Sequence, residues 1–230
     1  MGGGRCGLEP GDPVLRLARQ IFETSGLRFA GLQAYHGAAQ HLRTPAEREA
    51  AIQSAVSRVL QTKSVLEANG IACELVTGAG TGTYLIEAAS GVYDELQAGS
   101  YIFMDVDYAK NLGEDGRPLD RFQNSLFVYA TVISRPARDR AVVDAGHKAV
   151  PIDSGLPQVS GIPDVEYTRP SDEHGTLVVK NPDCDLKIGD KVTLIPAHCD
   201  PTVNLFDWYV GIRNNHVEVL WPITARGAMR

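Results

Sequence analysis

Hydrophobic residues recur at helical spacing through much of the first half of the chain. Residues 12–26 open with Asp-Pro, carry apolar side chains three or four positions apart and end on glycine, which predicts a helix. A longer helix is predicted over 44–70, because this segment starts with a Thr-x-x-Glu capping box and closes on glycine. Shorter apolar runs predict strands at 27–35, 71–78 and 99–108, with a weaker helix between the last two. Strands separated by helices predict a parallel α/β arrangement.

The pattern changes to short β-type runs from about residue 125. These runs are rich in β-branched and aromatic residues and are divided by Gly, Pro, Asp and Asn. They lie at 125–136, 140–150, 175–181, 190–198 and 216–224. The polar segment 111–124 carries turn residues without apolar periodicity, which is typical of a domain junction. We therefore expect an α/β domain over 1–120 and an all-β domain over 121–230.

Composition narrows the possible partners. The chain has 230 residues, 43% of them hydrophobic, and a net charge of -6; it can bury a core, and it lacks the clustered basic residues that a nucleic-acid partner needs. No apolar run approaches the roughly 20 residues that span a bilayer, and the start MGGGRCGLEPGDP lacks the features of a secretion signal. We expect a cytoplasmic protein without a membrane partner. Its four cysteines have no CxxC spacing, so reduced thiols are expected.

The segment TGAGTGTY, residues 77–84, could bind a phosphate. It follows a predicted strand and precedes a helical segment, and its glycines allow backbone amides to approach an anion closely. A plain tight turn explains the same glycines, because the segment has neither the Rossmann spacing nor the Gly-Lys-Ser/Thr of a P-loop.

The segment GLQAYHGAAQH, residues 31–41, ends a predicted strand and gathers Gln33, Tyr35, His36 and His41. In parallel βα proteins substrates bind at the carboxyl ends of strands, where His and Tyr can act as acids, bases or ring contacts. The alternative is a surface loop with incidental histidines, and for His41 alone that alternative is favoured.

The segment PAHCD, residues 196–200, is a candidate metal site. Strand alternation would put His198 and Asp200 on one side and Cys199 on the other. An imidazole and a carboxylate two positions apart suit a zinc or manganese-like ion, and two protein ligands leave positions open for water or substrate, as catalysis requires. A plain hydrogen bond between the histidine and the aspartate is the competing interpretation.

Six blocks of the sequence together resemble the D-threonine aldolases. They are GRCGLEPG, GLRFAGLQAYHGAAQH, VTGAGTGTY, DELQAGSYIFMDVDY, VDAGHKAVPIDSGLP and PAHCDPTVNLFDWYV, and they cover nearly all of the chain. The resemblance implies a (β/α)8 TIM-type barrel of the alanine racemase fold type followed by a C-terminal β domain. It also implies two cofactors, pyridoxal 5'-phosphate and a divalent metal (Mn, Zn or Mg).

The resemblance assigns roles to particular residues. Arg5 would contact the cofactor ring near its pyridine nitrogen, Tyr35 would lie by the cofactor, and His41 would be the acid or base at the substrate. His198 and Asp200 would hold the metal beside the cofactor. The cofactor phosphate would be held by Gly80, Thr81, Gly82, Gly99 and Ser100.

The activity that the resemblance implies is cleavage of a D-3-hydroxy amino acid, such as D-threonine, into glycine and an aldehyde. The D-serine dehydratases share the fold and the cofactor, and a dehydratase-like lyase is the alternative. In those enzymes the metal pair is His-x-Cys, whereas this sequence reads His-Cys-Asp. That difference favours the aldolase.

The lysine that binds the cofactor covalently in such enzymes is not found in the matching blocks. It is expected on the first barrel strand, and of the six lysines here only Lys148, in the terminal domain, is expected near the active site. We therefore expect residues 1–120 to form a partial barrel without its N-terminal strands, in a truncated form of the enzyme. Such a chain could be a non-catalytic cofactor- or metal-binding fragment, could require a separate N-terminal half, or could pair as a homodimer that covers the exposed sheet edges.

Overall fold

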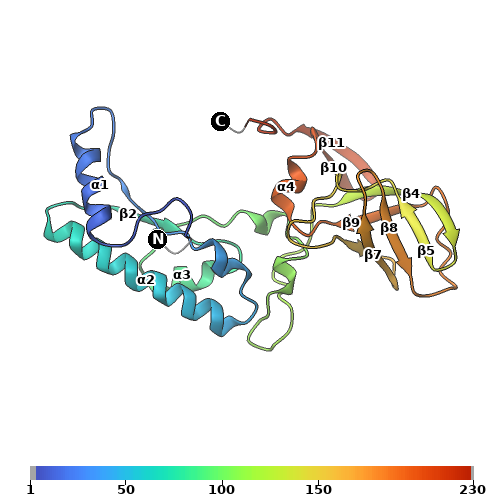
Figure 1. Cartoon of the computed structure of the whole chain (residues 1–230), viewed down its shortest axis with the longest axis horizontal. Helices are drawn as coiled ribbons and strands as arrows, with labels where there is room; N and C mark the ends of the chain where they lie inside the picture. Colours follow the sequence, from blue (N-terminus) through green and yellow to red (C-terminus); the bar gives the residue numbers. More distant parts are fainter. Residues whose placement is uncertain (1–3, 229–230) are drawn as a thin grey trace. The chain divides into compact units, whose positions relative to one another are not determined.

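The computed structural model describes residues 4–228 and divides into two compact units (Figure 1). The first unit runs to Tyr101 and includes Tyr108–Arg121, and the second comprises Ile102–Asp107 and the chain from Phe122 onward. Each unit has its own hydrophobic core.

The short segment 102–107 is held by backbone hydrogen bonds within the second unit. The Val106 amide donates to the Pro196 carbonyl at 3.0 Å, and the Asp107 amide donates to the Ala197 carbonyl at 3.3 Å. These two bonds explain why a segment from the middle of the α/β half belongs to the unit that follows it.

The strand predicted over 99–108 is wrong. The structure has 3-10 helices there, η2 (Ser100–Ile102) and η3 (Tyr108–Lys110), and Met104 between them has a φ of 50°. A residue in the left-handed region interrupts an extended strand. The third strand of the first unit lies earlier in the chain, at Glu95–Leu96 (β3).

The helices predicted in the first unit are confirmed. The second of them begins with a reciprocal capping box, in which the Glu47 amide donates to Thr44 Oγ1 at 3.3 Å and the Thr44 amide donates to Glu47 Oε2 at 3.0 Å. The helices are α1 (Asp12–Glu23), α2 (Pro45–Ala68) and α3 (Tyr84–Ser90), with an additional 3-10 helix, η1 (Gly37–His41).

Three short parallel strands form the sheet of the first unit, in the order β1, β2, β3. β1 (Gly31–Gln33) pairs with β2 (Leu75–Gly78), and β2 pairs with β3. Gly31 lies so close to its partner strand that a Cβ there would overlap the Leu75 carbonyl oxygen. A glycine is therefore required where these strands meet.

A six-stranded antiparallel sheet forms most of the second unit, in the order β6, β9, β4, β5, β8, β7, and β10 and β11 form a separate pair. The five predicted β runs each contain a strand, whereas β6, β7 and β10 were not predicted. The strands are β4 (Val128–Ala137), β5 (Arg140–Val143), β6 (Gln158–Ser160), β7 (Val165–Pro170), β8 (Gly175–Val179), β9 (Lys191–Ile195), β10 (Trp208–Arg213) and β11 (His216–Pro222). A short helix, α4 (Cys199–Val203), lies between β9 and β10 in the sequence.

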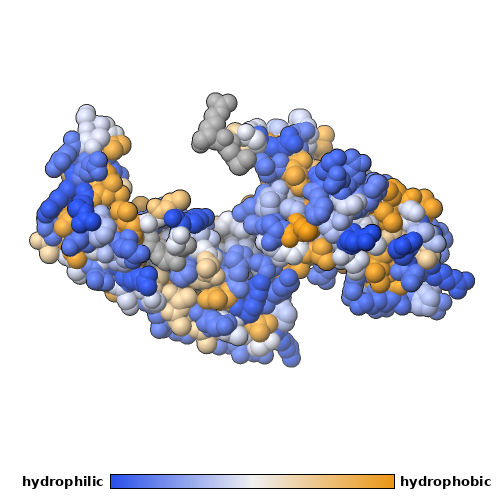
Figure 2. Space-filling model, viewed as in Figure 1, coloured by the Kyte–Doolittle hydropathy of each residue, from blue (hydrophilic) through white to orange (hydrophobic). Residues whose placement is uncertain are grey.

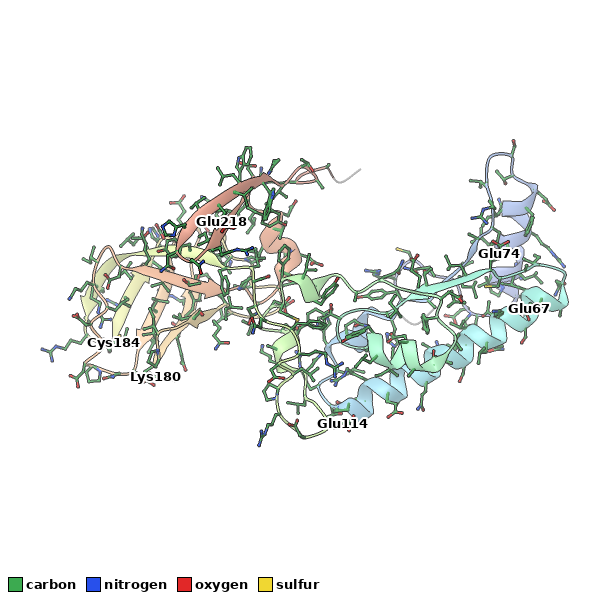
Figure 3. All side chains as sticks on the ribbon, turned by 180° about the vertical axis from the view of Figure 1, so that it is seen from behind. Glu67, Glu74, Glu114, Lys180, Cys184 and Glu218 are labelled. Atoms are coloured by element: carbon green, nitrogen blue, oxygen red, sulfur yellow. The ribbon has the colours of Figure 1, made fainter. Side chains whose placement is uncertain are left out.

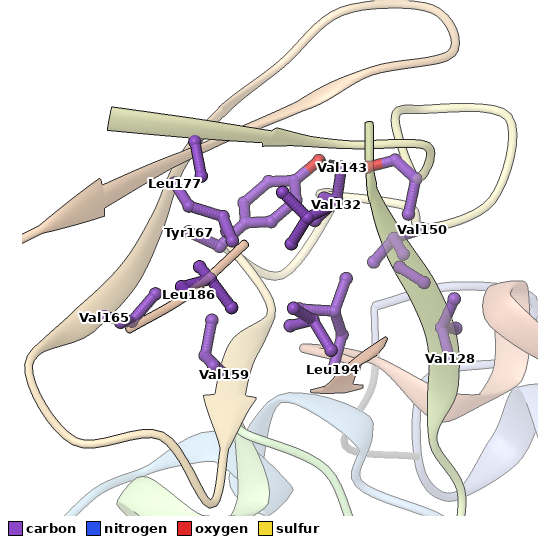
Figure 4. Packing of buried hydrophobic residues seen from close by; sticks show 14 of the residues in the cluster. Val128, Val132, Val143, Val150, Val159, Val165, Tyr167, Leu177, Leu186 and Leu194 are labelled. Carbon is purple, nitrogen blue, oxygen red and sulfur yellow. Dashed lines mark hydrogen bonds between the residues drawn. The ribbon is translucent and has the colours of Figure 1, made fainter. Parts of the chain in front are cut away.

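Valine and leucine side chains from the six-stranded sheet pack into the core of the second unit (Figure 4). Leu177 and Val132 are fully buried there. Tyr167 lies among them, and its hydroxyl donates to the Ala145 carbonyl at 2.8 Å. Burial raises the pKa of Tyr167 to about 12, so this hydroxyl stays protonated at neutral pH and keeps its hydrogen bond.

Large hydrophobic side chains also reach the surface, as the orange regions of Figure 2 show. In the first unit Phe22 and Leu27 are more than half exposed. The β10–β11 pair is exposed to the same degree, through Trp208, Val210, Ile212, Val217, Leu220 and Trp221. This hairpin therefore contributes apolar surface rather than core.

Charged side chains of the second unit pair on its surface. Lys180 pairs with Glu166, and Arg213 Nε lies 3.3 Å from Glu218 Oε2; Lys180 and Glu218 are labelled in Figure 3. Every side chain in these pairs is half exposed or more, so water screens the attraction strongly. The apolar core, rather than these pairs, stabilises the unit.

No helix among residues 4–228 is long and apolar enough to cross a membrane. The four cysteines, Cys6, Cys73, Cys184 and Cys199, lie within the described residues and form no disulfide with one another.

Replacing Leu177 by alanine should destabilise the second unit by about 2–5 kcal/mol, because the change leaves a cavity at a fully buried position. Both tryptophans of the chain lie in this unit, so tryptophan fluorescence during denaturant unfolding measures it selectively. Ile188→Ala is the matched control, since Ile188 is 66% exposed, and it should change the unfolding free energy by less than about 0.5 kcal/mol. Equal effects of the two substitutions would contradict the core described above.

Candidate functional site

The carboxyl ends of the three parallel strands meet at one edge of the sheet in the first unit. Just past β1, the Ala34 amide donates to the Thr77 carbonyl at 2.7 Å, and just past β3, the Gln97 amide donates to the Gly78 carbonyl at 2.7 Å. Gln33 Nε2 also donates to Gln97 Oε1 at 2.6 Å. Ligands of parallel α/β proteins bind at such an edge. The loops that leave this edge carry Tyr35, His41, the turn at 80–82 and the segment at 99–100.

Arg5 and Tyr35, both predicted at the cofactor ring, lie beside each other. The Arg5 guanidinium carbon is 5.8 Å from the centre of the Tyr35 ring, a distance at which a cation is attracted to an aromatic face. The structure thus brings together a cation and a phenol from segments 30 residues apart in the sequence, and both could contact a flat, electron-poor ring.

His41 ends the 3-10 helix η1 and is exposed. Its ring centre lies 5.0 Å from that of Tyr108 at an interplanar angle of 40°. His36 begins the same helix, and its Nδ1 accepts the Ala39 amide at 3.4 Å. Burial, followed by the nearby Arg58, lowers the pKa of His36, so His36 is a neutral cap, whereas His41 is exposed to solvent.

The two predicted phosphate segments are adjacent in space. Thr81 is buried, and its Oγ1 accepts the Tyr101 amide at 3.0 Å, which joins the turn at 80–82 to the segment at 99–101. Ala79, the residue before this turn, has a φ of 68°, an unusual conformation for a residue with a side chain. Local strain of this kind is found most often at functional sites.

Gln40 was missed in the sequence and explains much of the glycine turn. A Cβ at Gly80 would come within 2.5 Å of Gln40 Oε1, and one at Gly82 would overlap the Gln40 carbonyl oxygen. The Gly82 amide donates to Gln40 Oε1 at 3.0 Å, and the Thr83 and Tyr84 amides both donate to the Gly80 carbonyl. These amides therefore bond within the protein, so at this turn the Thr81 hydroxyl stays a candidate donor to a phosphate. No local sequence pattern marks Gln40, because its importance depends on a turn that lies 40 residues later.

A buried carboxyl is bonded to the end of this turn. Glu87 on α3 is 1% exposed, and its Oε1 accepts from Thr83 Oγ1 at 2.7 Å. Burial raises the pKa of Glu87, and the hydrogen bond from Thr83 opposes this only in part.

The candidate metal pair lies in the second unit, in a geometry that differs from the predicted one. β9 ends at Ile195, and α4 begins at Cys199, so the strand alternation invoked for PAHCD is wrong. His198 has extended backbone before the helix and Asp200 lies in its first turn. Their side chains still approach each other, with His198 Nε2 at 3.8 Å from Asp200 Oδ2.

Asp153 was missed in the sequence and orients the histidine. Its Oδ2 lies 2.5 Å from His198 Nδ1, and Ser154 Oγ lies 3.3 Å from the same nitrogen. Burial alone would raise the pKa of Asp153, but the hydrogen bonds to His198 and Ser154 lower it below its ordinary value. A carboxylate on Nδ1 leaves Nε2 directed toward Asp200, which is the arrangement of many metal-binding histidines.

Cys199 lies between the two candidate ligands but is not directed to solvent. It is 1% exposed, its amide donates to Asp105 Oδ2 at 3.1 Å, and its thiol donates to Asp200 Oδ1 at 3.3 Å. Within the described residues no group of three or more His, Cys, Asp or Glu is placed to hold a metal ion. The donor set of one imidazole and one carboxylate, both partly exposed, fits a divalent ion that also binds water or substrate.

Two family models match successive parts of the chain. A model of the alanine racemase N-terminal domain matches residues 1–107, and a model of a putative serine dehydratase domain matches residues 125–212. The 3-hydroxy-D-aspartate aldolase of Paracoccus denitrificans (strain Pd 1222) is 47% identical over 228 residues, which are 98% of this chain and 58% of that protein. The D-threonine aldolase of Arthrobacter sp is 47% identical over 230 residues, which are 100% of this chain and 60% of that protein.

Among solved structures, the D-threonine aldolase from Filomicrobium marinum is similar with a TM-score of 0.92 and 48% identity, over 98% of this chain and 60% of that chain. The chain therefore has an alanine racemase-like fold with a C-terminal barrel-like β domain. It is a homologue of the D-threonine and 3-hydroxy-D-aspartate aldolases along its whole length. The fold class and the resemblance predicted from the sequence are thereby confirmed. The chain spans 58 to 60% of the length of these two curated relatives.

Replacing Glu87 by glutamine should stabilise the protein at neutral pH. The pKa of Glu87 is raised in the folded protein, so the buried carboxyl contributes its full stability at pH values below 4.5, the ordinary pKa of this group. This contribution is lost as the pH rises through the raised pKa of the folded protein. Glutamine keeps an acceptor for Thr83 but does not ionise. The gain in thermal midpoint, variant minus wild type, should therefore be largest at neutral pH and should shrink in acid.

Glu67→Gln on α2 is the control, because Glu67 is exposed and its replacement should give no pH-dependent difference. A gain for Glu87→Gln that is equal at both pH values would show that ionisation of Glu87 is not the cause.

Proposed function

We propose that this chain supplies cofactor- and metal-binding residues of an aldolase-type lyase, which cleaves D-3-hydroxy amino acids such as D-threonine into glycine and an aldehyde. The observation that carries the proposal is 47% identity to both a 3-hydroxy-D-aspartate aldolase and a D-threonine aldolase over the whole chain. The residues that the sequence singled out also lie at the carboxyl edge of the parallel sheet and at the start of α4, where their side chains could bind such groups.

At the cofactor site the residues of this chain bind and orient. Pyridoxal 5'-phosphate, when bound, supplies an electron sink for the carbon that loses its substituent. Arg5 and Tyr35 would contact its ring, since they already lie against each other. The Thr81 hydroxyl would donate to its phosphate, with Gly80, Gly82, Gly99 and Ser100 lining the same place.

At the metal site His198 Nε2 and the Asp200 carboxylate would be the two protein ligands, and Mn, Zn or Mg would suit them. A bound divalent ion lowers the pKa of a coordinated hydroxyl group, which is the chemistry that cleavage beside a 3-hydroxyl requires. Asp153 would keep His198 in the tautomer that presents Nε2. The histidine that moves a proton at the substrate would be His41, because it is exposed at the end of η1.

A dehydratase-like lyase is the second candidate, because a putative serine dehydratase domain model matches residues 125–212. The carboxylate of Asp200 in place of a thiolate favours the aldolase. The products separate the two reactions, since an aldolase releases glycine and a dehydratase releases ammonia and a 2-oxo acid.

The chain spans 58 to 60% of the curated relatives' length, and the cofactor lysine that the resemblance implies is not in the blocks that match. Lys148 is an improbable substitute for a cofactor lysine, since its Nζ already pairs with Glu173 Oε1 at 2.9 Å.

The proposed activity is tested by incubating the purified chain with pyridoxal 5'-phosphate, Mn²⁺ and D-threonine and measuring glycine. We expect glycine when the chain is combined with the segment of an aldolase relative that precedes the matched region, and little from the chain alone. His198→Ala should abolish glycine release by the combination, and L-threonine is the control substrate. Ammonia in place of glycine would support the dehydratase, and no product from a combination that binds both cofactors would contradict the proposed activity.

The role of Asp153 is tested by titrating Mn²⁺ calorimetrically into the chain. Asp153→Ala should weaken Mn²⁺ binding about 10- to 100-fold, the usual effect of removing a carboxylate that orients a metal-binding histidine. Asp153→Asn keeps an acceptor for Nδ1 and should lose less. Asp172→Ala, which removes an exposed carboxylate from the same unit, should bind as the wild type does. If Asp153→Ala also binds as the wild type does, Asp153 does not orient the ligand.

A further inference from the structure

The Gln40 side chain connects the two segments of the first unit that carry the candidate cofactor residues. It is completely buried and belongs to η1, directly before His41. Its amide lies against the glycine turn at 80–82. Amides are seldom fully buried unless each polar atom has a partner, so the contacts of this side chain indicate what it does.

All of the hydrogen-bonding groups of the Gln40 amide are engaged. Nε2 donates to Thr83 Oγ1 at 2.7 Å and to the His36 carbonyl at 3.2 Å, while Oε1 accepts the Gly82 amide at 3.0 Å. The Gln40 amide thus joins His36, at the start of η1, to Gly82 at the end of the glycine turn and to Thr83, which follows it.

Thr83 and Glu87 determine which atom donates in these hydrogen bonds. Thr83 Oγ1 accepts from Gln40 and donates its own proton to Glu87 Oε1 at 2.7 Å. The Thr83 hydroxyl proton is thus used in the bond to Glu87, so Thr83 Oγ1 can only accept from Gln40. Thr83 and Glu87 are each 1% exposed, so water does not compete for these bonds.

The backbone of Gln40 is also held by residues outside the glycine turn. Its carbonyl accepts from Asn111 Nδ2 at 2.8 Å, and Asn111 is fully buried. The Arg48 guanidinium donates to the carbonyls of Leu42, Arg43 and Leu112 at 2.7 to 2.8 Å. The loop that bears Gln40 thus has anchors outside the glycine turn, which would hold Gln40 in place against the turn.

We propose that Gln40 is a positioning residue, which holds the 80–82 turn at the place where Thr81 receives the phosphate of the cofactor. The inference rests on the proposed function, since it assumes that the turn binds this phosphate. Gly80 and Gly82 are glycines because Gln40 occupies the space beside them, and Thr81 between them is the residue whose position Gln40 sets.

The inference predicts that Gln40 acts on recognition of the phosphate and not on binding of the pyridoxal ring. Gln40→Met keeps the volume but leaves the Gly82 amide without its acceptor and removes the hydrogen bond that Thr83 Oγ1 accepts. A buried donor that loses its partner is strongly unfavourable, and the turn would move to satisfy it. Arg5 and Tyr35 are not among the partners of the Gln40 amide, so contacts of the ring with these two residues would be kept.

The experiment measures the affinities of the full chain for pyridoxal 5'-phosphate and for pyridoxal, which lacks the phosphate, by fluorescence titration. The quantity compared is the ratio of the two affinities. Gln40→Met should lower this ratio about tenfold or more, while the affinity for pyridoxal changes little. Thr83→Val should act in the same direction, and Thr83→Ser, which restores the hydroxyl, should return the ratio toward the wild-type value.

Two controls separate positioning from a general loss of structure. Glu87→Gln retains an acceptor for Thr83 and should leave the ratio unchanged. Mn²⁺ binding, which the proposed function assigns to the other unit, should also be unchanged in each variant. If Gln40→Met does not fold, as judged by circular dichroism, the Thr83→Val and Thr83→Ser pair decides the question.

The outcomes distinguish this inference from the proposed function. A wild-type chain that binds both compounds equally would overturn the phosphate site itself and the inference with it. A wild-type preference for the phosphate that survives in the Thr83→Val and Gln40→Met variants would overturn the inference and leave the proposed site standing. An equal loss of affinity for both compounds would show a structural role only, which also contradicts the inference.

Discussion

The parallel pairing of β1 with β2 places the ends of both strands, and of β3 beyond them, at one edge of a small sheet. The close approach of Gly31 to Leu75 allows this pairing, and the bond from the Ala34 amide to the Thr77 carbonyl continues it past the last residue of β1. Every candidate cofactor residue described in the first unit, apart from Arg5, lies in a loop that leaves this edge. Without the shared edge, these loops would have no common place to bind a ligand.

The glycines of the 80–82 turn predict a ligand site from the sequence, but packing against Gln40 also requires them. Its amides from Gly82 to Tyr84 bond within the protein, and Cβ atoms at Gly80 and Gly82 would collide with Gln40. A tight turn and a phosphate site were alternatives from the sequence, but in the structure they are compatible. The glycines pack against Gln40, and Thr81 between them stays a candidate ligand of the phosphate.

The two candidate metal ligands of the second unit come together in a geometry other than the predicted one. His198 and Asp200 were predicted from the two-residue period of a strand, yet they come together because the chain turns into α4 between them. Asp153, 45 positions earlier, orients the imidazole. That these two residues bind a metal stays a prediction, whereas the strand geometry given for them was wrong.

The sequence by itself determined the elements whose signals are local. The capping box of α2, the apolar spacing of α1 and the β-branched runs of the second half depend on neighbouring residues, and each of these elements formed as predicted. Only the tertiary structure decided that residues 102–107 join the second unit, that Gln40 lies under the glycine turn and that Asp153 reaches His198. The physical reason is that these features depend on hydrogen bonds between residues 42 to 94 positions apart, and no periodicity in a single segment encodes a partner so distant.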